Sequence, residues 1–313
     1  MRQTFQHADF EALTRLWNQF YPEKFRIDPA ILRQNTVDSP VFDWGVSRIE
    51  ENNGEVLAFV AFKRSAAGLF KGPSVDQAHL SAIAYTDPNI AVDLMAEAKR
   101  TLRNRGVNKI VFGADSRHFF PGCPVEGRVL CDFLMVEGFE SGTEVFDLER
   151  DLTNYQPQHQ APEGIELRPL ASEDDIVSLR VFLEHEFPGR WLHDAMDKIR
   201  AEDRPDCVYA AFEGPKVVGF ALIQDSKQKQ PIAGGIWRND LGEKWGSLGP
   251  IGVATEMRGK GLGHALLAHA LDHLKQSGVD RCIIDWTTLE DFYGRHGFQI
   301  ARTYKNSSLR LGD

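Results

Sequence analysis

The sequence predicts an α/β protein built from two similar domains, and three observations support this. The chain has 313 residues, of which 42% are hydrophobic and 26% charged, so it is long enough for two domains of ordinary size. A polar stretch at 151–167 (DLTNYQPQHQAPEGIEL) carries two prolines and no hydrophobic periodicity, as is typical of a linker. The predicted domains are 1–152 and 162–313. The third observation is an internal repeat.

The repeat relates the two halves at an offset of 172 residues. Residues 91–113 (AVDLMAEAKRTLRNRGVNKIVFG) align with 263–285 (GHALLAHALDHLKQSGVDRCIID). Both segments predict an amphipathic helix, a glycine that ends it and a short apolar strand. The identical pairs are Leu94 and Leu266, Ala96 and Ala268, Ala98 and Ala270, Leu102 and Leu274, Gly106 and Gly278, and Val107 and Val279.

The other predicted elements follow in the same order in both halves. Residues 52–64 and 212–225 each predict a turn that enters an apolar strand of a hairpin. Residues 135–152 and 293–311 each run from a helix end through Gly-Phe into a strand. Each half therefore reads β, helices, β-hairpin, β, α, β, α, β. Chance similarity between α/β segments is the alternative, but the shared order favours duplication.

Composition narrows the class of function. The net charge of −9 argues against a general nucleic-acid binder, because that affinity comes mainly from Lys and Arg neutralising phosphates. No run of 18 apolar residues is present, so no membrane span is expected. The first residues lack the apolar core of a signal peptide, so a cytoplasmic location is expected. Four cysteines without a CxxC pair predict reduced, mostly buried thiols, with neither disulfides nor zinc. They are Cys123, Cys131, Cys207 and Cys282.

Three alternate glycines follow a predicted strand near the C-terminus. Residues 245–254 predict that strand and 262–278 a helix, so the segment TEMRGKGLG connects the two. A helix N-terminus exposes unpaired N–H groups and binds anions, and glycine lets the backbone approach a phosphate. Arg258 and Lys260 add positive charge. The segment therefore predicts a diphosphate site, whereas a turn without a ligand would not call for this pattern.

The spacing of these glycines excludes two common phosphate-binding motifs. A Walker loop needs G-x-x-x-x-G-K-[ST], but Ala254 occupies the first glycine position and Gly261 follows Lys260. A dinucleotide fingerprint needs a third glycine where this chain has His264 or Leu266. The diphosphate therefore belongs to another class of ligand.

Two ordered motifs resemble the GNAT N-acetyltransferase family. The pattern V-x-x-x-x-R-G-x-G-x-G at 253–263 is similar to the family's acetyl-CoA pyrophosphate motif, Q/R-x-x-G-x-G/A after the fourth strand. Residues 291–298 (DFYGRHGF) are similar to its terminal FY-x-x-x-GF segment. The resemblance covers the second half well and the first half more loosely. It implies two tandem GNAT-like domains, each a mixed, mostly antiparallel sheet flanked by helices.

The resemblance also implies where acetyl-CoA, the co-substrate, would bind. Loop amides and Arg258 would hold the diphosphate, and pantetheine would pair with the free edge of the fourth strand. The amide of Val253 would face the thioester oxygen. An asparagine that the family often carries is absent, and Asp285 or Thr287 are the candidates to replace its contact. The implied cofactor-binding residues are Ile251, Gly252, Val253, Arg258, Gly259, Lys260, Gly261, Leu262, Gly263 and His264, and no metal is expected.

The resemblance makes Tyr293 the candidate general acid. A phenol with a pKa near 10 stays protonated at neutral pH and can protonate the leaving thiolate; packing under the cofactor is the alternative role. The base is not identified, and Glu184 and Glu186 are candidates because the family places substrate-binding helices there. Ordinary solvated helix residues are the alternative. The long segment 226–245 predicts either a substrate loop or a surface excursion.

The first half is expected to lack the cofactor site. Its corresponding stretch, IAYTDPNIA at 83–91, has no glycine; Pro88 suits a first helical turn and Asp87 a cap, whose charge repels phosphate. The sequence therefore predicts an N-acetyltransferase that acts on an amine of a small molecule or peptide by direct attack in a ternary complex, as a monomer or homodimer. A non-catalytic acyl-CoA-binding module and an acyltransferase with another donor are the alternatives.

Overall fold

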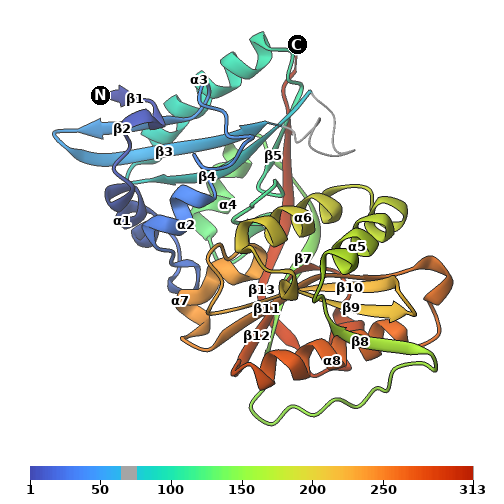
Figure 1. Cartoon of the computed structure of the whole chain (residues 1–313). Helices are drawn as coiled ribbons and strands as arrows, with labels where there is room; N and C mark the ends of the chain where they lie inside the picture. Colours follow the sequence, from blue (N-terminus) through green and yellow to red (C-terminus); the bar gives the residue numbers. More distant parts are fainter. Residues whose placement is uncertain (65–75, 313) are drawn as a thin grey trace. The chain divides into compact units, whose positions relative to one another are not determined.

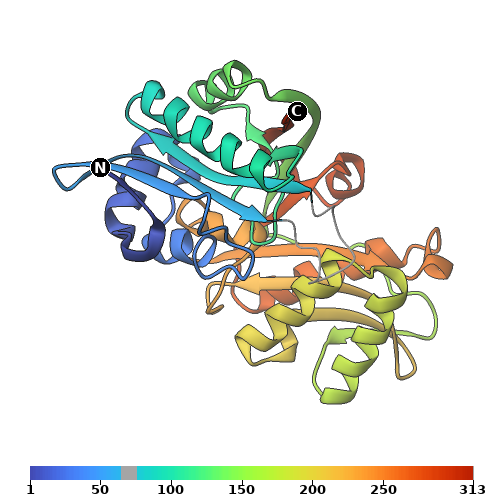
Figure 2. The same ribbon diagram turned by 90° about the horizontal axis from the view of Figure 1, so that it is seen from above.

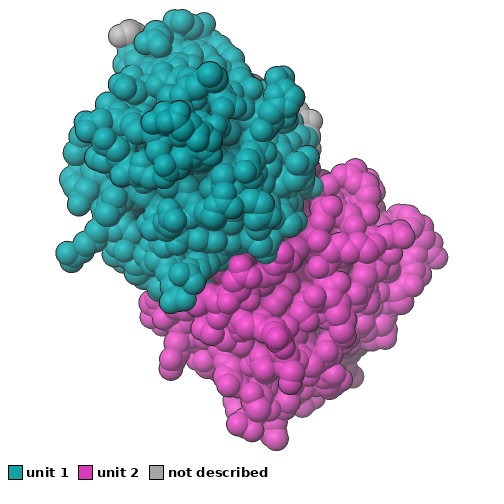
Figure 3. All heavy atoms as spheres, turned by 90° about the vertical axis from the view of Figure 1, so that its left-hand side faces the viewer, with its two compact units in different colours: residues 1–67, 72–146, 302–313 teal, residues 68–71, 147–301 magenta. Residues whose placement is uncertain are grey.

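The computed structural model describes residues 1–64 and 76–312, which form two compact units. Unit 1, teal in Figure 3, contains described residues 1–64, 76–146 and 302–312, and unit 2, magenta, contains 147–301. Strands β7 (Glu140–Asp151) and β13 (Gln299–Arg310) each contribute residues to both units. The boundaries of the units therefore differ from those of the predicted domains, 1–152 and 162–313, at these two strands. The two domains remain a prediction from the sequence repeat.

Unit 1 is a sheet with helices on both faces. Strands β1 to β4 pair antiparallel in order, β5 pairs parallel with β4, and residues 307–310 of β13 pair antiparallel with β5. Helix α3 covers one face of β3 and β4 and helix α1 the other, so both strands are buried throughout most of their length (Figure 2). The elements are β1 (Arg2–Gln3), η1 (Phe5–His7), α1 (Phe10–Phe20), η2 (Glu23–Phe25), α2 (Pro29–Gln34), β2 (Arg48–Asn52), β3 (Glu55–Arg64), β4 (Gln77–Tyr85), α3 (Pro88–Asn104), β5 (Lys109–Phe112), β6 (Cys123–Pro124) and α4 (Arg128–Val136).

Unit 2 repeats this plan. Strands β8 to β11 pair antiparallel and β12 pairs parallel with β11; α5 and α6 lie on one face and α8 on the other (Figure 1). This mixed, mostly antiparallel sheet flanked by helices confirms the predicted fold class. Within the described residues, no helix combines the length and hydrophobicity that crossing a bilayer requires. The elements are β8 (Ile165–Pro169), α5 (Glu173–Glu186), α6 (Arg190–Glu202), η3 (Pro205–Cys207), β9 (Val208–Glu213), β10 (Lys216–Asp225), η4 (Ala233–Trp237), α7 (Arg238–Leu241), β11 (Trp245–Val253), η5 (Thr255–Met257), α8 (Leu262–Gln276), β12 (Arg281–Thr287) and α9 (Glu290–Gly294).

The predicted repeat recurs in backbone conformation at the same offset of 172. Gly106 (φ 77°) and Gly278 (φ 102°) follow α3 and α8 in the left-handed region, as predicted. Ala114 (φ 55°) and Trp286 (φ 45°) occupy that region where the chain leaves β5 and β12. Residues with side chains rarely adopt it, so its recurrence at equivalent positions supports duplication.

The structure brings together two cysteines that the sequence analysis treated as scattered. The Sγ atoms of Cys123 on β6 and Cys131 on α4 lie 2.9 Å apart. The hydrogen bond from the Cys123 thiol lowers the pKa of Cys131. Cys207 and Cys282 are buried free thiols, as predicted, and burial raises the pKa of Cys207 to about 12.

Candidate functional site

Strand β11 changes partners where it approaches the glycine loop. It pairs with β12 over Trp245–Ser247, whereas its pairing with β10 continues to Val253. Between Leu248 and Ile251 the register against β10 shifts by one residue, which marks a bulge in β11. In the described part of the chain, the edge of β11 beyond Ser247 makes no further ladder pairs with β12. This edge is therefore free for an extended ligand, as the family resemblance implies.

Aromatic side chains cover the backbone of β11 at Gly252. A Cβ at Gly252 would lie 2.6 Å from Phe187 Cζ and 3.1 Å from Trp191 Cζ3, so only glycine permits this close contact. The ring centroids of Phe187 and Trp191 lie 4.7 Å apart, and each also contacts Phe220. The link between α5 and α6 therefore forms an apolar wall beside the end of β11.

The loop after β11 leaves the start of α8 open. Gly259 (φ 75°) and Gly261 (φ 82°) adopt left-handed conformations, and a Cβ at either would meet no atom within 4 Å. Arg258 and Lys260 are exposed beside them. Gly261 caps α8 without a side-chain hydrogen bond, whereas Ser172 caps α5 through its hydroxyl. The first amides of α8 are therefore available to an anion.

Glu186, one of the two candidate bases, is bound to this loop. Its Oε2 accepts hydrogen bonds from Thr255 N (3.0 Å) and Thr255 Oγ1 (2.8 Å) and lies 3.7 Å from the Arg258 guanidinium. The hydroxyl bond from Thr255 is the largest cause of a lowered pKa at Glu186. Its side chain, 6% exposed, therefore positions the loop entry. Glu184, on the same helix, is exposed.

Tyr293 lies on α9 in an apolar environment. It is 5% exposed and makes edge-to-face contacts with Phe292 and Phe298 at centroid distances of 5.0 and 6.1 Å. Burial, with a smaller contribution from the charge of Asp285, raises the pKa of the phenol, which is therefore protonated at neutral pH. Asp285 Oδ1 lies 3.6 Å from where a Cβ at Gly249 would be, so this carboxylate sits where β11 and β12 separate.

A charged and aromatic cluster that the sequence analysis missed lies at the end of β12. The Arg190 guanidinium lies 4.7 Å from the Trp286 ring centroid, and Arg190 Nε donates to Asp194 Oδ2 at 2.9 Å. The Trp286 amide donates to Asp147 Oδ1 at 3.1 Å, which supports the left-handed exit from the strand. No local motif predicts this cluster, because α6 and β12 are far apart in the sequence.

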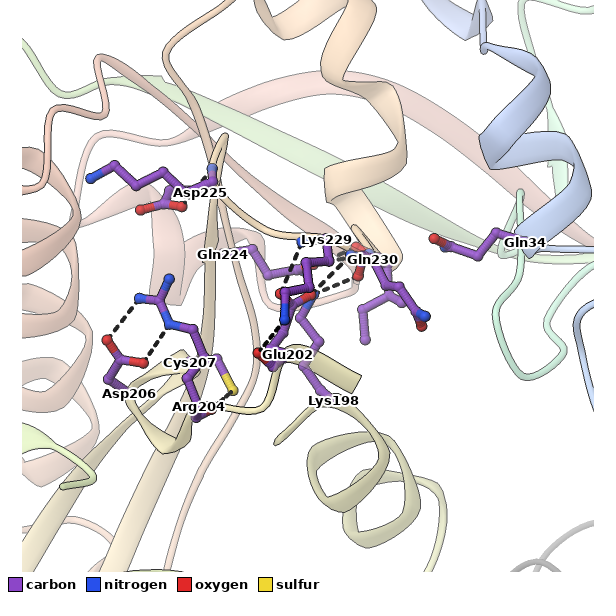
Figure 4. Close-up of polar contacts among 12 residues, drawn as sticks. Gln34, Lys198, Glu202, Arg204, Asp206, Cys207, Gln224, Asp225, Lys229 and Gln230 are labelled. Atoms are coloured by element: carbon purple, nitrogen blue, oxygen red, sulfur yellow. Dashed lines mark hydrogen bonds and ion pairs between the residues drawn. The ribbon is translucent and has the colours of Figure 1, made fainter. Parts of the chain in front are cut away.

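The long segment 226–245, predicted as a substrate loop or a surface excursion, is anchored to unit 2 by buried polar groups (Figure 4). Lys198 Nζ donates to Glu202 Oε1 at 2.7 Å, and both side chains are 1% exposed. Glu202 also accepts from the amides of Lys229 and Gln230, each at 2.9 Å. Further along, Trp237 is buried. This segment therefore packs into the unit rather than extending into solvent.

Comparison with known proteins relates part of unit 2 to acetyltransferases. Residues 176–298 match the family model described as acetyltransferase (GNAT) family. The mycothiol acetyltransferase of Thermobispora bispora is 27% identical over 168 residues, which cover 51% of this chain and 52% of that protein. The mycothiol acetyltransferase of Kytococcus sedentarius is 30% identical over 154 residues, or 46% and 49% of the two chains. This chain thus spans about half the length of these relatives.

Solved structures share the fold over almost the whole chain. The GCN5-related glucosamine N-acetyltransferase region of a fungal multi-domain GH3 β-N-acetylglucosaminidase has a TM-score of 0.84 at 22% identity and covers 99% of this chain and 38% of that one. A GCN5-related N-acetyltransferase from Sphaerobacter thermophilus has a TM-score of 0.71 at 16% identity, and the match covers 100% of this chain and 96% of that one. A tandem GNAT protein from the clavulanic acid biosynthesis pathway has a TM-score of 0.69 at 13% identity, and the match covers 100% of this chain and 99% of that one. The likeness concerns the fold and extends to unit 1.

Proposed function

We propose that unit 2, in which residues 176–298 match the GNAT acetyltransferase family model, transfers an acetyl group from acetyl-CoA to a primary amine of a small molecule or peptide. The observation that carries this proposal is the uncapped start of α8 directly after a strand whose edge is free. Amides of 259–263, with Arg258 and Lys260, would hold the diphosphate. Pantetheine would lie along β11, with the Val253 amide facing the thioester oxygen.

The chemistry assigns separate roles to the titratable residues. The amine attacks the thioester carbonyl in a ternary complex, the tetrahedral oxyanion is stabilised by a backbone N–H, and collapse expels the thiolate. Tyr293 would protonate that thiolate, because its phenol is protonated at neutral pH. Burial raises its pKa, which weakens it as an acid. Glu184 is the better candidate base, acting directly or through water, because Glu186 is engaged by Thr255 and has a lowered pKa.

The acceptor is proposed to be a small molecule. The curated relatives are named mycothiol acetyltransferases, which supports a small-molecule acceptor over a peptide one. The Arg190–Trp286 pair at the end of β12 offers a flat apolar face next to a guanidinium. Such a surface suits a polar ring more than an extended chain, and it is where acceptor selectivity is expected.

The alternative is a non-catalytic acyl-CoA-binding module. Calorimetry with acetyl-CoA and a thiol-release assay over a panel of small amines, glucosamine among them, would separate the two. We expect binding together with amine-dependent thiol release. Binding without release for any amine would favour the module, and the absence of binding would contradict both functions.

A further inference from the structure

Three histidines from separate segments of unit 2 meet beside the start of α8. His159 comes from the stretch between β7 and β8, His264 from the first turn of α8 and His296 from the turn after α9. One ring nitrogen of each lies within 4.8 Å of the others. His264 Nδ1 and His296 Nε2 are 2.9 Å apart, and the His159 ring centroid lies 5.0 Å from each of the other two rings.

We propose that His159, His264 and His296 bind one late first-row transition-metal ion, with Zn²⁺ as its representative. Imidazole is the commonest protein ligand for such ions, and three imidazoles with an open fourth position form a known zinc geometry. No metal is expected from the sequence, where the three histidines lie far apart; only the fold brings them together.

The three rings must rotate before their nitrogens can converge on one ion, because the His264 ring lies nearly parallel to the His159 and His296 rings, at interplanar angles of 19°. Zn–N bonds near 2.0–2.1 Å place the ligand nitrogens of a tetrahedral site about 3.4 Å apart. The His264 and His296 nitrogens would separate slightly from 2.9 Å, and His159 would move inward. His159 is half-buried on an irregular segment, and its ring would have to turn as well as move inward.

The surroundings of the site carry charges of both signs. The pocket that His264 lines contains Glu290 and Asp291 from the start of α9, and also Arg295. The fourth position of the metal would be open to water or to an anionic oxygen. A bound ion would therefore link the stretch between β7 and β8 to both α8 and α9. His264 is also one of the residues implied for the cofactor, so the test measures the metal itself in the absence of acetyl-CoA.

The test is metal titration of the full chain after treatment with a chelator. Calorimetry with Zn²⁺ and visible absorption with Co²⁺, whose bands report tetrahedral coordination, should both give one ion per chain. Loss of a residue that only hydrogen-bonds to a metal ligand already lowers metal affinity by about 10–100-fold. Loss of a ligand itself in His159→Asn should therefore weaken binding by roughly 100-fold or more. His7→Asn, which changes an exposed histidine of unit 1, is the matched control and should bind as the wild type does.

His296 is buried, so His296→Gln is used only with circular dichroism to check its fold. His159→Asn keeps the proposal testable even if that variant unfolds. No binding by the wild-type chain, or equal affinity in the wild type and His159→Asn, would overturn the proposal. A tetrahedral Co²⁺ spectrum that disappears in His159→Asn and persists in His7→Asn would support it.

Discussion

Tyr293 and Glu186, both candidates for proton transfer, occupy different environments. Tyr293 is packed between Phe292 and Phe298, and burial raises its pKa, so the phenol is protonated at neutral pH. Glu186 is fixed by Thr255 in a charged state, which suits a positioning residue. At the scale of single residues, the environment of Glu186 therefore favours a positioning role over the role of base that the sequence suggests for it.

If Tyr293 is the acid, Tyr293→Phe should lower turnover by about 10²–10⁴-fold. Affinity for acetyl-CoA should barely change, because the hydroxyl acts mainly in the transition state. Steady-state thiol release and calorimetry measure the two effects. Tyr209→Phe is the matched control: its hydroxyl donates to Leu167 O at 3.1 Å, so this variant should lose about 1 kcal/mol of stability and keep its turnover. Near-normal turnover of Tyr293→Phe would assign Tyr293 to packing.

Asp175 makes the stability of unit 2 depend on acid pH. Arg168 donates to both its carboxylate oxygens, at 2.8 and 3.0 Å, and this bidentate bond is the main reason that its pKa is lowered to about 2. A group with a depressed folded pKa stabilises the fold fully above its unfolded value near 4 and loses that contribution as pH falls toward 2.

Asp175→Asn should therefore destabilise the chain by about 2 kcal/mol at pH 7 and by much less near pH 2. Urea unfolding of wild type and variant across this range measures the difference. Asp174→Asn, at the exposed neighbouring position, is the control and should leave the pH profile unchanged. A deficit that is the same at pH 7 and pH 2 would show that the carboxylate's charge is not its source.

At the scale of elements, the features that local sequence encodes were predictable. The left-handed glycine after α8 and the Asp87 cap of α3 are confirmed, because each is specified by backbone conformation and capping within a few residues. The Lys198–Glu202 anchor and the Arg190–Trp286 contact were not predicted. The anchor acts on distant amides, and the contact requires α6 and β12 to be adjacent, which no local pattern specifies.

The glycine loop gives a prediction at this scale. Gly261→Asp should abolish acetyl-CoA binding, because a carboxylate would then lie against the proposed diphosphate site. The apo protein has space for the side chain, but the φ of 82° adds backbone strain, so a control must carry the same strain. Gly214→Asp supplies it: Gly214 lies in the β9–β10 turn at φ 59°, also with nothing within 4 Å of a Cβ.

Calorimetry and thermal unfolding of the two Asp variants separate binding from stability. Both should lose a comparable amount of stability, and only Gly261→Asp should lose acetyl-CoA. Gly261→Asn keeps the size without the charge and, since asparagine tolerates this conformation, should retain more affinity than Gly261→Asp. Unchanged affinity in Gly261→Asp would contradict the diphosphate assignment.

At the scale of the whole molecule, the first turn of α3 in unit 1 differs from the first turn of α8 in unit 2. The Asp87 side chain accepts a hydrogen bond from Asn89 N at 2.9 Å, so a carboxylate occupies the helix start that Gly261 leaves open in unit 2. Lys63 is fully buried and hydrogen-bonded to Asp115, which also accepts from Ser81 Oγ at 2.8 Å. These side chains form a buried polar network that joins β3 and β4 to the residues after β5.

The chain should therefore bind one acetyl-CoA, and the binding site should lie in unit 2. In unit 1, a phosphate would have to displace the Asp87 cap against the repulsion of its charge. Calorimetry at saturating acetyl-CoA should give a stoichiometry of one for the wild type and zero for Gly261→Asp. A wild-type stoichiometry of two, with one site remaining in Gly261→Asp, would place a second site in unit 1 and contradict the expected loss of the cofactor site there.

Asp87→Ser, which keeps a capping hydroxyl and removes the charge, then tests whether that carboxylate excludes phosphate. A stoichiometry that rises from one to two would make the Asp87 carboxylate the group that excludes phosphate from unit 1.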